Sequence, residues 1–474
     1  MANDVEAVMA RAARHAIAYR NAIAQAERTP TATYGQMFEV FDAPTPETGG
    51  EPEAIIDELA SLATPGIRAS TAPRFFGWVI GQSHPTGVAA DWLTAAWGQN
   101  GGNIACAPAA SAVEAVAAGW LLDLLRLPAE ASVGLVTGAT VANFVCLAAA
   151  RSEVLRQVGW DAEADGLFGA PPIEVLIGAD AHVTVFSALR YLGLGAARVR
   201  TVETDSLGRI DPGAFERALR AKGGPMIAIG QAGQINTGAS DPFAEIAPLA
   251  RERGAWLHVD GAFGLWAQAC PSRADQTAGV EGADSWAVDG HKWLQTPYDC
   301  GYAIVRDPEA HRRSMAVSAS YLPPAADAER DPSAYVPELS RRARGFATWA
   351  MIKQFGREGV AEMIERCCRL ARKMAEAIAA EPGAACVCEV PLNQFMIRFG
   401  ADADDARGDA LTLATIAALQ ADAVAFIGAS QWRGRWVMRC SVTSSATTDK
   451  AADETVASVI RAWRKVKAGA GESA

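Results

Sequence analysis

Hydrophobic positions along most of the chain follow two alternating periods. Short apolar runs of strand length, such as residues 132–136 and 226–230, are separated by segments whose apolar residues recur every three to four positions, the spacing of an amphipathic helix. The alternation continues to the apolar run that ends at Asp260. Because parallel neighbouring strands need helical crossovers, this pattern predicts an α/β fold with a mainly parallel, helix-covered sheet.

The two ends of the chain follow other patterns. Residues 1–28 have helical spacing and are followed by a Thr/Pro-rich stretch over residues 29–52. Near the other end, a Pro-rich loop over residues 321–337 precedes a long helix, predicted over residues 346–381 with an interruption near Gly356. Shorter strand and helix candidates follow. We therefore expect three units: an N-terminal helical segment (1–75), a large domain (76–310), and a loop with a small α+β domain (311–474).

Composition narrows the range of partners. The chain has 474 residues, too many for one small domain, and its Lys and Arg total of 43 against 54 Asp and Glu gives a net charge of −11. That charge disfavours nucleic acid and membrane surfaces as partners. Nine cysteines without a CxxC pair favour free thiols in the cytoplasm, and no metal site is predicted. No long uncharged apolar run suggests membrane insertion or export.

Two polar residues follow strand-like runs in the middle of the chain. Asp260 ends one run and Lys292 follows the next, 292 − 260 = 32 residues later, which is about one β-α-β unit. Two such strand ends bring their side chains to the same rim of a parallel sheet, where open α/β sheets bind ligands. The alternative is that Asp260 caps a turn and Lys292 is a surface cation.

The strings HVDGAFG at 258–264 and DGHKWL at 289–294 resemble motifs of the group II amino acid decarboxylases dependent on pyridoxal 5′-phosphate (PLP). The resemblance implies PLP fold type I, with a seven-stranded, mainly parallel sheet and a small C-terminal domain. It also implies homodimers, to which the N-terminal segment contributes by exchange. Lys292 would form the Schiff base with PLP and Asp260 would keep the ring nitrogen protonated.

Further site residues are implied by the same resemblance. Ala139 and Thr140 match the family's phosphate-binding turn, where a helix begins on small residues. His182 matches the histidine that stacks on the pyridine ring, and His291 precedes the lysine. Taken alone, the turn could be plain capping and His182 a hydrogen-bonded structural residue.

Three residues are candidates for the substrate pocket. The segment with Phe75 and Phe76 resembles one that lies near the substrate in the family, and Arg439 matches an arginine that binds the substrate carboxylate in some members. These aromatic residues favour an aromatic amino acid as substrate. The alternatives are that the rings belong to the core and that Arg439 is structural.

The chain departs from the family at three places. Asp289 stands where Asn is usual and Ile235 where a hydroxyl is usual, and both predict weaker cofactor binding. In the loop before the arginine-rich helix start, Pro332 occupies the place of the tyrosine that donates a proton after CO₂ leaves. Tyr335 is the better substitute and Tyr321 the other.

The predicted reaction is decarboxylation of an L-amino acid to its amine. Aldehyde-forming oxidative decarboxylation, a lyase or aminotransferase reaction, and a catalytically silent homologue stay open, because PLP fold type I hosts several reactions. A nucleotide-binding oxidoreductase is disfavoured, since no GxGxxG motif followed by an acid occurs at the first strand.

Overall fold

A seven-stranded sheet forms the centre of the computed structural model, which describes residues 5–26, 29–316 and 330–471. The strand order is β1-β7-β6-β5-β4-β2-β3, and β7 runs antiparallel to both of its neighbours while the other pairings are parallel. The predicted mainly parallel, seven-stranded sheet is therefore confirmed. Its strands are β1 (Ser132–Val136), β2 (Glu174–Gly178), β3 (Arg200–Val202), β4 (Met226–Gln231), β5 (Trp256–Asp260), β6 (Ser285–Asp289) and β7 (Gly301–Val305).

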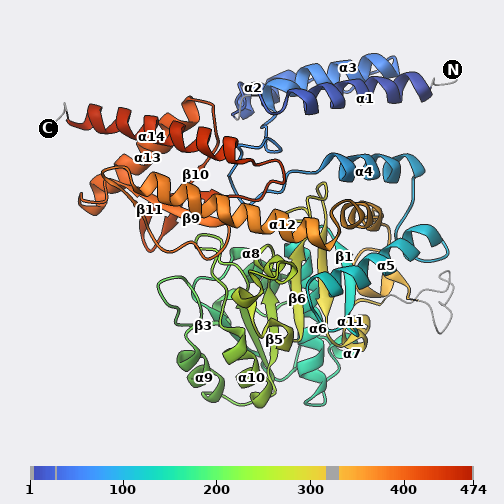
Figure 1. Ribbon diagram of the computed structural model, residues 1–474. Coiled ribbons are helices and arrows are strands. Elements are labelled where there is room, and N and C mark those ends of the chain that lie inside the picture. Colours follow the sequence, from blue (N-terminus) through green and yellow to red (C-terminus); the bar gives the residue numbers. More distant parts are fainter. Residues whose placement is uncertain (1–4, 27–28, 317–329, 472–474) are drawn as a thin grey trace.

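Helices cover both faces of this sheet (Figure 1). The strands read as almost uninterrupted buried runs because each face packs against a helical layer. One layer contains α6 (Ala139–Arg156), α8 (Val183–Tyr191) and α11 (Pro308–Met315). The other contains α5 (Pro108–Leu124), α9 (Pro212–Arg220), α10 (Phe243–Arg253) and α12 (Gly345–Ala379).

A smaller antiparallel sheet of order β10-β11-β9-β8 lies beside the large one and carries α13 and α14. The long helix α12 joins the two parts and is interrupted at Gly356, whose φ is 60°, as the sequence predicted. The elements are β8 (Ala384–Cys386), β9 (Gln394–Phe399), α13 (Asp405–Ala421), β10 (Gly428–Trp432), β11 (Arg435–Ser441) and α14 (Asp449–Gly471).

Three local expectations differ from the structure. The Thr/Pro-rich stretch contains a helix, α2 (Tyr34–Phe41), which begins with a capping box between Thr33 and Gln36. Strand β10 was not predicted, because it is a partly exposed edge strand without a continuous apolar run. The expected domain boundary at residue 311 falls inside α11, which packs against α6 of the large sheet.

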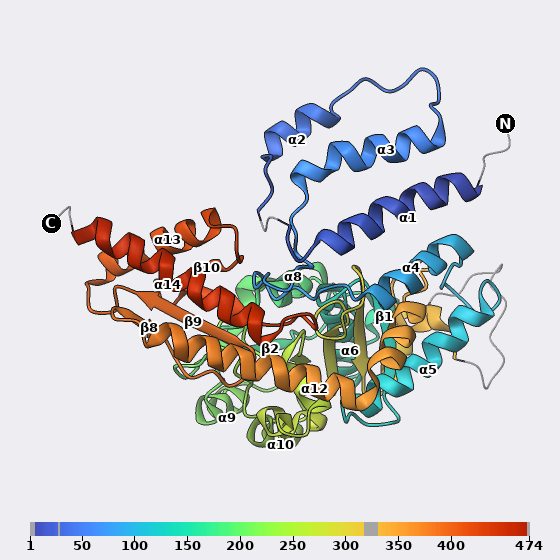
Figure 2. The same cartoon turned by 45° about the horizontal axis from the view of Figure 1, so that its top comes forward.

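The N-terminal helices α1 (Val5–Ala22), α2 and α3 (Pro52–Ala63) stand together at one side of the molecule, away from both sheets (Figures 1 and 2). None of the three contains a buried residue. A further helix, α4 (Pro85–Trp97), lies between them and the sheet. Among the described residues, no helix has the length and apolar character needed to cross a membrane.

Candidate active site

Asp260 and Lys292 lie at the same rim of the large sheet. Asp260 is the last residue of β5, and β6, which is parallel to it, ends at Asp289 three residues before Lys292. Parallel neighbours present their carboxyl ends together, so the strand ends meet as the sequence predicted. The backbone at Gly81 passes close to Lys292: an added Cβ would lie 2.2 Å from the carbonyl oxygens of both His291 and Lys292.

Asp260 is a buried carboxyl group, 5 % exposed, and its Oδ1 accepts a hydrogen bond of 3.3 Å from the backbone N–H of Ala262. Burial raises the pKa of Asp260, while the positive charge of Lys292 and the hydrogen bond from Ala262 oppose that rise. An acid in this environment gains most from a cationic partner, which a protonated ring nitrogen provides.

Lys292 pairs with Asp289, whose side chain is almost completely buried. Nζ of Lys292 lies 2.9 Å from Oδ2 of Asp289, and Oδ1 of the same carboxylate accepts a hydrogen bond of 2.6 Å from the backbone N–H of Ala139. Ala139 is the first residue of α6, and a helix leaves its first N–H groups without partners inside the helix. Asp289 therefore links the lysine to the helix end predicted to bind phosphate.

The turn before α6 packs closely against neighbouring residues. A Cβ on Gly138 would lie 3.0 Å from Cε1 of His291 and 3.2 Å from Oδ1 of Asp289, and one on Gly301 would lie 2.5 Å from Cα of Gly138. Larger residues at these two positions would displace the turn. Thr140, one residue into the helix, is exposed.

His291 is oriented by its neighbours. Nδ1 accepts a hydrogen bond of 3.2 Å from the backbone N–H of Cys300, so in the neutral ring the proton is on Nε2, which lies 3.4 Å from Oδ1 of Asp289. Burial lowers the pKa of His291. Its ring also lies against the half-exposed ring of Tyr298, with centroids 4.4 Å apart.

His182 and Arg439 belong to the same electrostatic group as Asp260, Lys292 and Asp289. Burial lowers the pKa of His182. The charges of Asp260 and Asp289 raise this pKa, and those of Lys292 and Arg439 lower it further. The imidazole thus favours its neutral form, with Nδ1 2.7 Å from the hydroxyl of Thr184. Arg439, half-buried on β11, reaches Oδ1 of Asn236 at 3.5 Å.

Other predicted residues are not brought to this group. Phe75 and Phe76 are 3 % and 1 % exposed, and Phe75 stacks on Phe426 at 4.9 Å, which favours the core alternative for both. The neighbouring Trp78 is 51 % exposed instead. Tyr335 packs against His311, with ring centroids 5.2 Å apart.

Two further residues singled out in the sequence are Tyr321 and Ile235. Tyr321 lies outside the described residues. Ile235 is partly buried and packs against the core of the molecule.

Phe263 also lies beside Lys292, although it is not among the residues predicted from the sequence. Its ring centroid lies 5.9 Å from Nζ of Lys292, and it also meets the ring of Trp293 edge-on. Its place inside the HVDGAFG string, three residues after Asp260, is the signal that could have indicated it.

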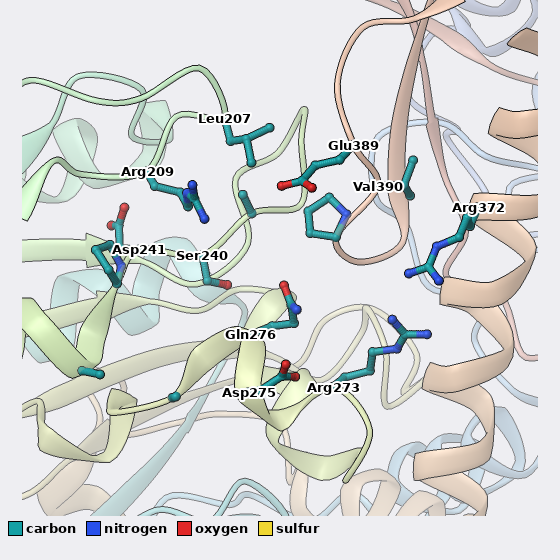
Figure 3. A pocket seen from close by; sticks show the side chains of 15 residues that line it. Leu207, Arg209, Ser240, Asp241, Arg273, Asp275, Gln276, Arg372, Glu389 and Val390 are labelled. Carbon is teal, nitrogen blue, oxygen red and sulfur yellow. The ribbon is translucent and has the colours of Figure 1, made fainter.

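A separate cleft of about 490 Å³ opens between the loops of the large sheet and the smaller sheet (Figure 3). Arginines 209, 273 and 372 line it, and so does Asp241, whose pKa is raised to about 7 by burial. Asp241 also lines, with Asp260, a small cavity of about 10 Å³. Neither Lys292 nor His182 lines the large cleft, so its ligand would not be the cofactor of the Lys292 site.

The rim fits PLP at both ends. Lys292 is one-fifth exposed and thus accessible to an aldehyde, and the buried Asp260 suits a ring nitrogen. The glycine turn before α6 has no side chain at Gly138, and it lies at a helix end that favours anions. The carboxylate of Asp289 opposes a phosphate there, because it is acidic and already accepts the N–H of Ala139.

Comparisons with known proteins agree with this geometry. The model of the pyridoxal-dependent decarboxylase conserved domain matches residues 35–398. Tryptophan decarboxylase 1 of Oryza sativa subsp. japonica is 27 % identical over 94 % of this chain and 90 % of its own length, and 4-hydroxyphenylacetaldehyde synthase of Rhodiola rosea is 26 % identical over 86 % and 84 %.

A solved structure shares the fold. The crystal structure of Oryza sativa TDC with PLP and tryptamine superposes with a TM-score of 0.90, at 24 % identity, over 98 % of both chains. The match of the domain model covers well over half of the chain. This protein therefore belongs to the pyridoxal-dependent decarboxylase family and is a PLP-dependent enzyme.

Proposed function

We propose that the protein decarboxylates an L-amino acid to its amine and that Lys292 holds the cofactor. The observation that carries the proposal is the meeting of Lys292, Asp260 and His182 at one rim, with Asp289 joining the lysine to the start of α6. When bound, PLP supplies an electron sink for the electron pair left behind as the substrate carboxylate departs as CO₂.

The side chains at the rim have separate roles in the proposed reaction. To act as a nucleophile, Nζ of Lys292 must lose a proton, and Oδ2 of Asp289 at 2.9 Å is placed to receive it. The carboxylate of Asp260 would hold a proton on the ring nitrogen. Neutral His182 would cover the ring face without competing for that proton.

An aromatic amino acid is the substrate class we favour. Trp78 is half-exposed and lies against Phe426 with ring centroids 5.2 Å apart, which offers an aromatic surface at the edge of the smaller sheet. Relatives are named tryptophan decarboxylase and aromatic-L-amino-acid decarboxylase. Arg439, half-buried beside the site, is the candidate that binds the substrate carboxylate.

Aldehyde formation is the second candidate. Two observations favour it: Pro332 stands where the proton-donating tyrosine is expected, and Tyr335 contacts His311 and the guanidinium of Arg330 rather than Lys292. A relative is named 4-hydroxyphenylacetaldehyde synthase. This reaction would consume O₂ and water and release the aldehyde, CO₂, ammonia and hydrogen peroxide.

The test is product analysis with the PLP-loaded enzyme. Tryptophan, tyrosine and phenylalanine are supplied in turn, and amine, CO₂, aldehyde and hydrogen peroxide are measured in the same reaction. We expect amine and CO₂ in equal amounts. Aldehyde and peroxide in place of amine would select the second candidate, and no CO₂ from any of the twenty amino acids would refute both.

The N-terminal helices support a homodimer as the assembly. They bury no residue of their own, and large apolar side chains are exposed on each of them, among them Met9, Phe38 and Leu59. Exposed apolar residues continue on α4 with Trp92 and Trp97. A second copy of the chain would cover this surface.

The nine free cysteines fit the reducing cytoplasm.

A further inference from the structure

His258 lies inside the large sheet, two residues before Asp260 on β5, and its side chain is inaccessible to solvent. Its Nδ1 is 2.9 Å from the hydroxyl oxygen of Ser285 on β6. Its Nε2 is 2.8 Å from Oδ1 of Asn143 on α6. One imidazole thus joins two adjacent strands and a helix that are far apart in the sequence.

Each of these three elements also carries a group of the cofactor site. Helix α6 begins at Ala139, one turn before Asn143, and β5 ends at Asp260. Strand β6 ends at Asp289, which pairs with Lys292 and accepts the N–H of Ala139. The imidazole therefore forms a second link between the strands and α6, one helical turn beyond the link made by Asp289.

The direction of these hydrogen bonds follows from the donors. Burial lowers the pKa of His258 to about 3, so the ring is neutral and carries one N–H. Oδ1 of Asn143 can only accept, so this N–H is on Nε2 and Nδ1 accepts from the hydroxyl of Ser285. The indole N–H of Trp256 in turn donates to the Ser285 oxygen at 2.9 Å.

We propose that His258 is a positioning residue that fixes the start of α6 relative to Asp260 and Lys292. The inference rests on the proposed cofactor placement, in which a rigid molecule is held at its phosphate, its ring nitrogen and its aldehyde. Three anchors on three elements hold such a molecule well only if their spacing is fixed before it binds. A single buried side chain that touches all three elements sets that spacing.

The chain contains a matched control. His311 is equally inaccessible, its pKa is also lowered by burial to about 3, and its Nδ1 lies 2.8 Å from the hydroxyl oxygen of Ser132. Its Nε2 lies 3.0 Å from the carbonyl oxygen of Tyr335. It has the same chemistry and burial, but it joins α11 to β1 and the segment after residue 330 instead of the cofactor elements.

The experiment compares His258→Leu, His258→Gln and Asn143→Ala with His311→Leu. The first readout is the dissociation constant of PLP from each apoprotein, measured by fluorescence. The second is hydrogen exchange of residues 139–143 in the apoprotein, which needs no cofactor and no turnover. Exchange in that helical turn reports directly on how firmly the start of α6 is held.

We expect His258→Leu and Asn143→Ala to raise the PLP dissociation constant by roughly tenfold or more and to speed exchange at residues 139–143. His258→Gln should recover part of both losses, since its amide can accept from Ser285 and donate to Asn143. His311→Leu should leave the dissociation constant within about twofold of wild type. If His258→Leu does not fold, Asn143→Ala alone provides the test, because it cuts only the link to α6.

Equal loss of PLP affinity in His258→Leu and His311→Leu would overturn the proposal, since it would indicate general softening of the core. Unchanged affinity and exchange in Asn143→Ala would overturn it as well. Failure of the proposed function shows differently: wild-type protein would bind PLP at Lys292, seen by mass spectrometry after borohydride reduction, yet release no CO₂ from amino acids.

Discussion

The strand-end rim of the large sheet and the N-terminal helices bury their side chains to opposite degrees. At and just inside the rim, His258 is fully buried and Asp289 and Asp260 are 3 % and 5 % exposed. His258 and Asp289 make hydrogen bonds to other elements of the same chain, and Asp260 accepts one from the backbone of Ala262. In the helices α1 to α3 no residue is buried, and Tyr34 is 83 % exposed.

The contrast separates contacts that one chain completes by itself from a surface that the proposed dimer would cover. The rim has a defined charge arrangement and defined hydrogen bonds within the single chain. The helices expose apolar surface whose burial would contribute favourable free energy only in an assembly. Substitutions at the rim should therefore change chemistry, and substitutions in the helices should change association.

The largest effect is expected from Lys292→Ala. The variant loses the amine proposed to hold the cofactor, so turnover should fall by roughly three orders of magnitude or more. The check is the decarboxylation rate together with mass spectrometry after borohydride reduction, which should find no cofactor-modified peptide. Full turnover, or modification of a different lysine, would show that the rim is not the reacting site.

Asp260→Asn should reduce the rate by roughly a hundredfold while leaving the fold intact, because a neutral amide does not hold the ring nitrogen protonated. Burial raises the pKa of Asp260, so the apoprotein variant loses a group whose charged form is disfavoured by the fold. Its melting temperature should equal or exceed that of wild type. A rate near wild type would exclude Asp260 as the ring partner.

The rim could be predicted from the sequence because Asp260 and Lys292 each follow a strand-length apolar run. Parallel topology then places both at the same edge, and no side-chain geometry is needed for that step. The role of Asp289 could not be predicted in the same way. Its bond to the N–H of Ala139 spans 150 residues, and such contacts depend on how α6 packs on β6.

The segment with Phe75, Phe76 and Trp78 also depends on long-range contacts that the sequence does not predict. Phe75 and Phe76 stand near the site by resemblance, but the ring of Phe75 packs against Phe426 near the other end of the chain, while Trp78 is left half-exposed. Trp78 also contacts Phe426, so which ring faces solvent depends on how the rings pack in the folded chain. A pattern of adjacent aromatic residues does not contain this information.

The helices are tested by Met9→Asp with Phe38→Asp. Both side chains are more than half exposed, so the charges cost the single chain little, yet they would be buried unpaired in a dimer. We expect the dimer dissociation constant to rise by roughly thirtyfold, about 2 kcal/mol, measured by sedimentation velocity. Glu47→Gln, in the exposed stretch between α2 and α3, is the control. A monomeric wild-type protein would remove the assembly from the comparison.

The smallest effect concerns Asp289, whose negative charge opposes that of the cofactor phosphate. Asp289→Asn keeps an oxygen that accepts from the N–H of Ala139 and removes a negative charge from the phosphate end. Affinity for PLP should rise by roughly three- to tenfold, about 1 kcal/mol, which fluorescence titration of the apoprotein measures.

The same substitution also removes the ion pair with Lys292, whose Nζ lies 2.9 Å from the carboxylate, and with it the acceptor for the lysine proton. We therefore expect PLP to bind more tightly but to attach covalently to Lys292 more slowly at neutral pH. A stopped-flow experiment separates the binding step from the attachment step. Weaker binding in Asp289→Asn would show instead that the carboxylate organises the phosphate end and that the lysine pair matters more than the repulsion.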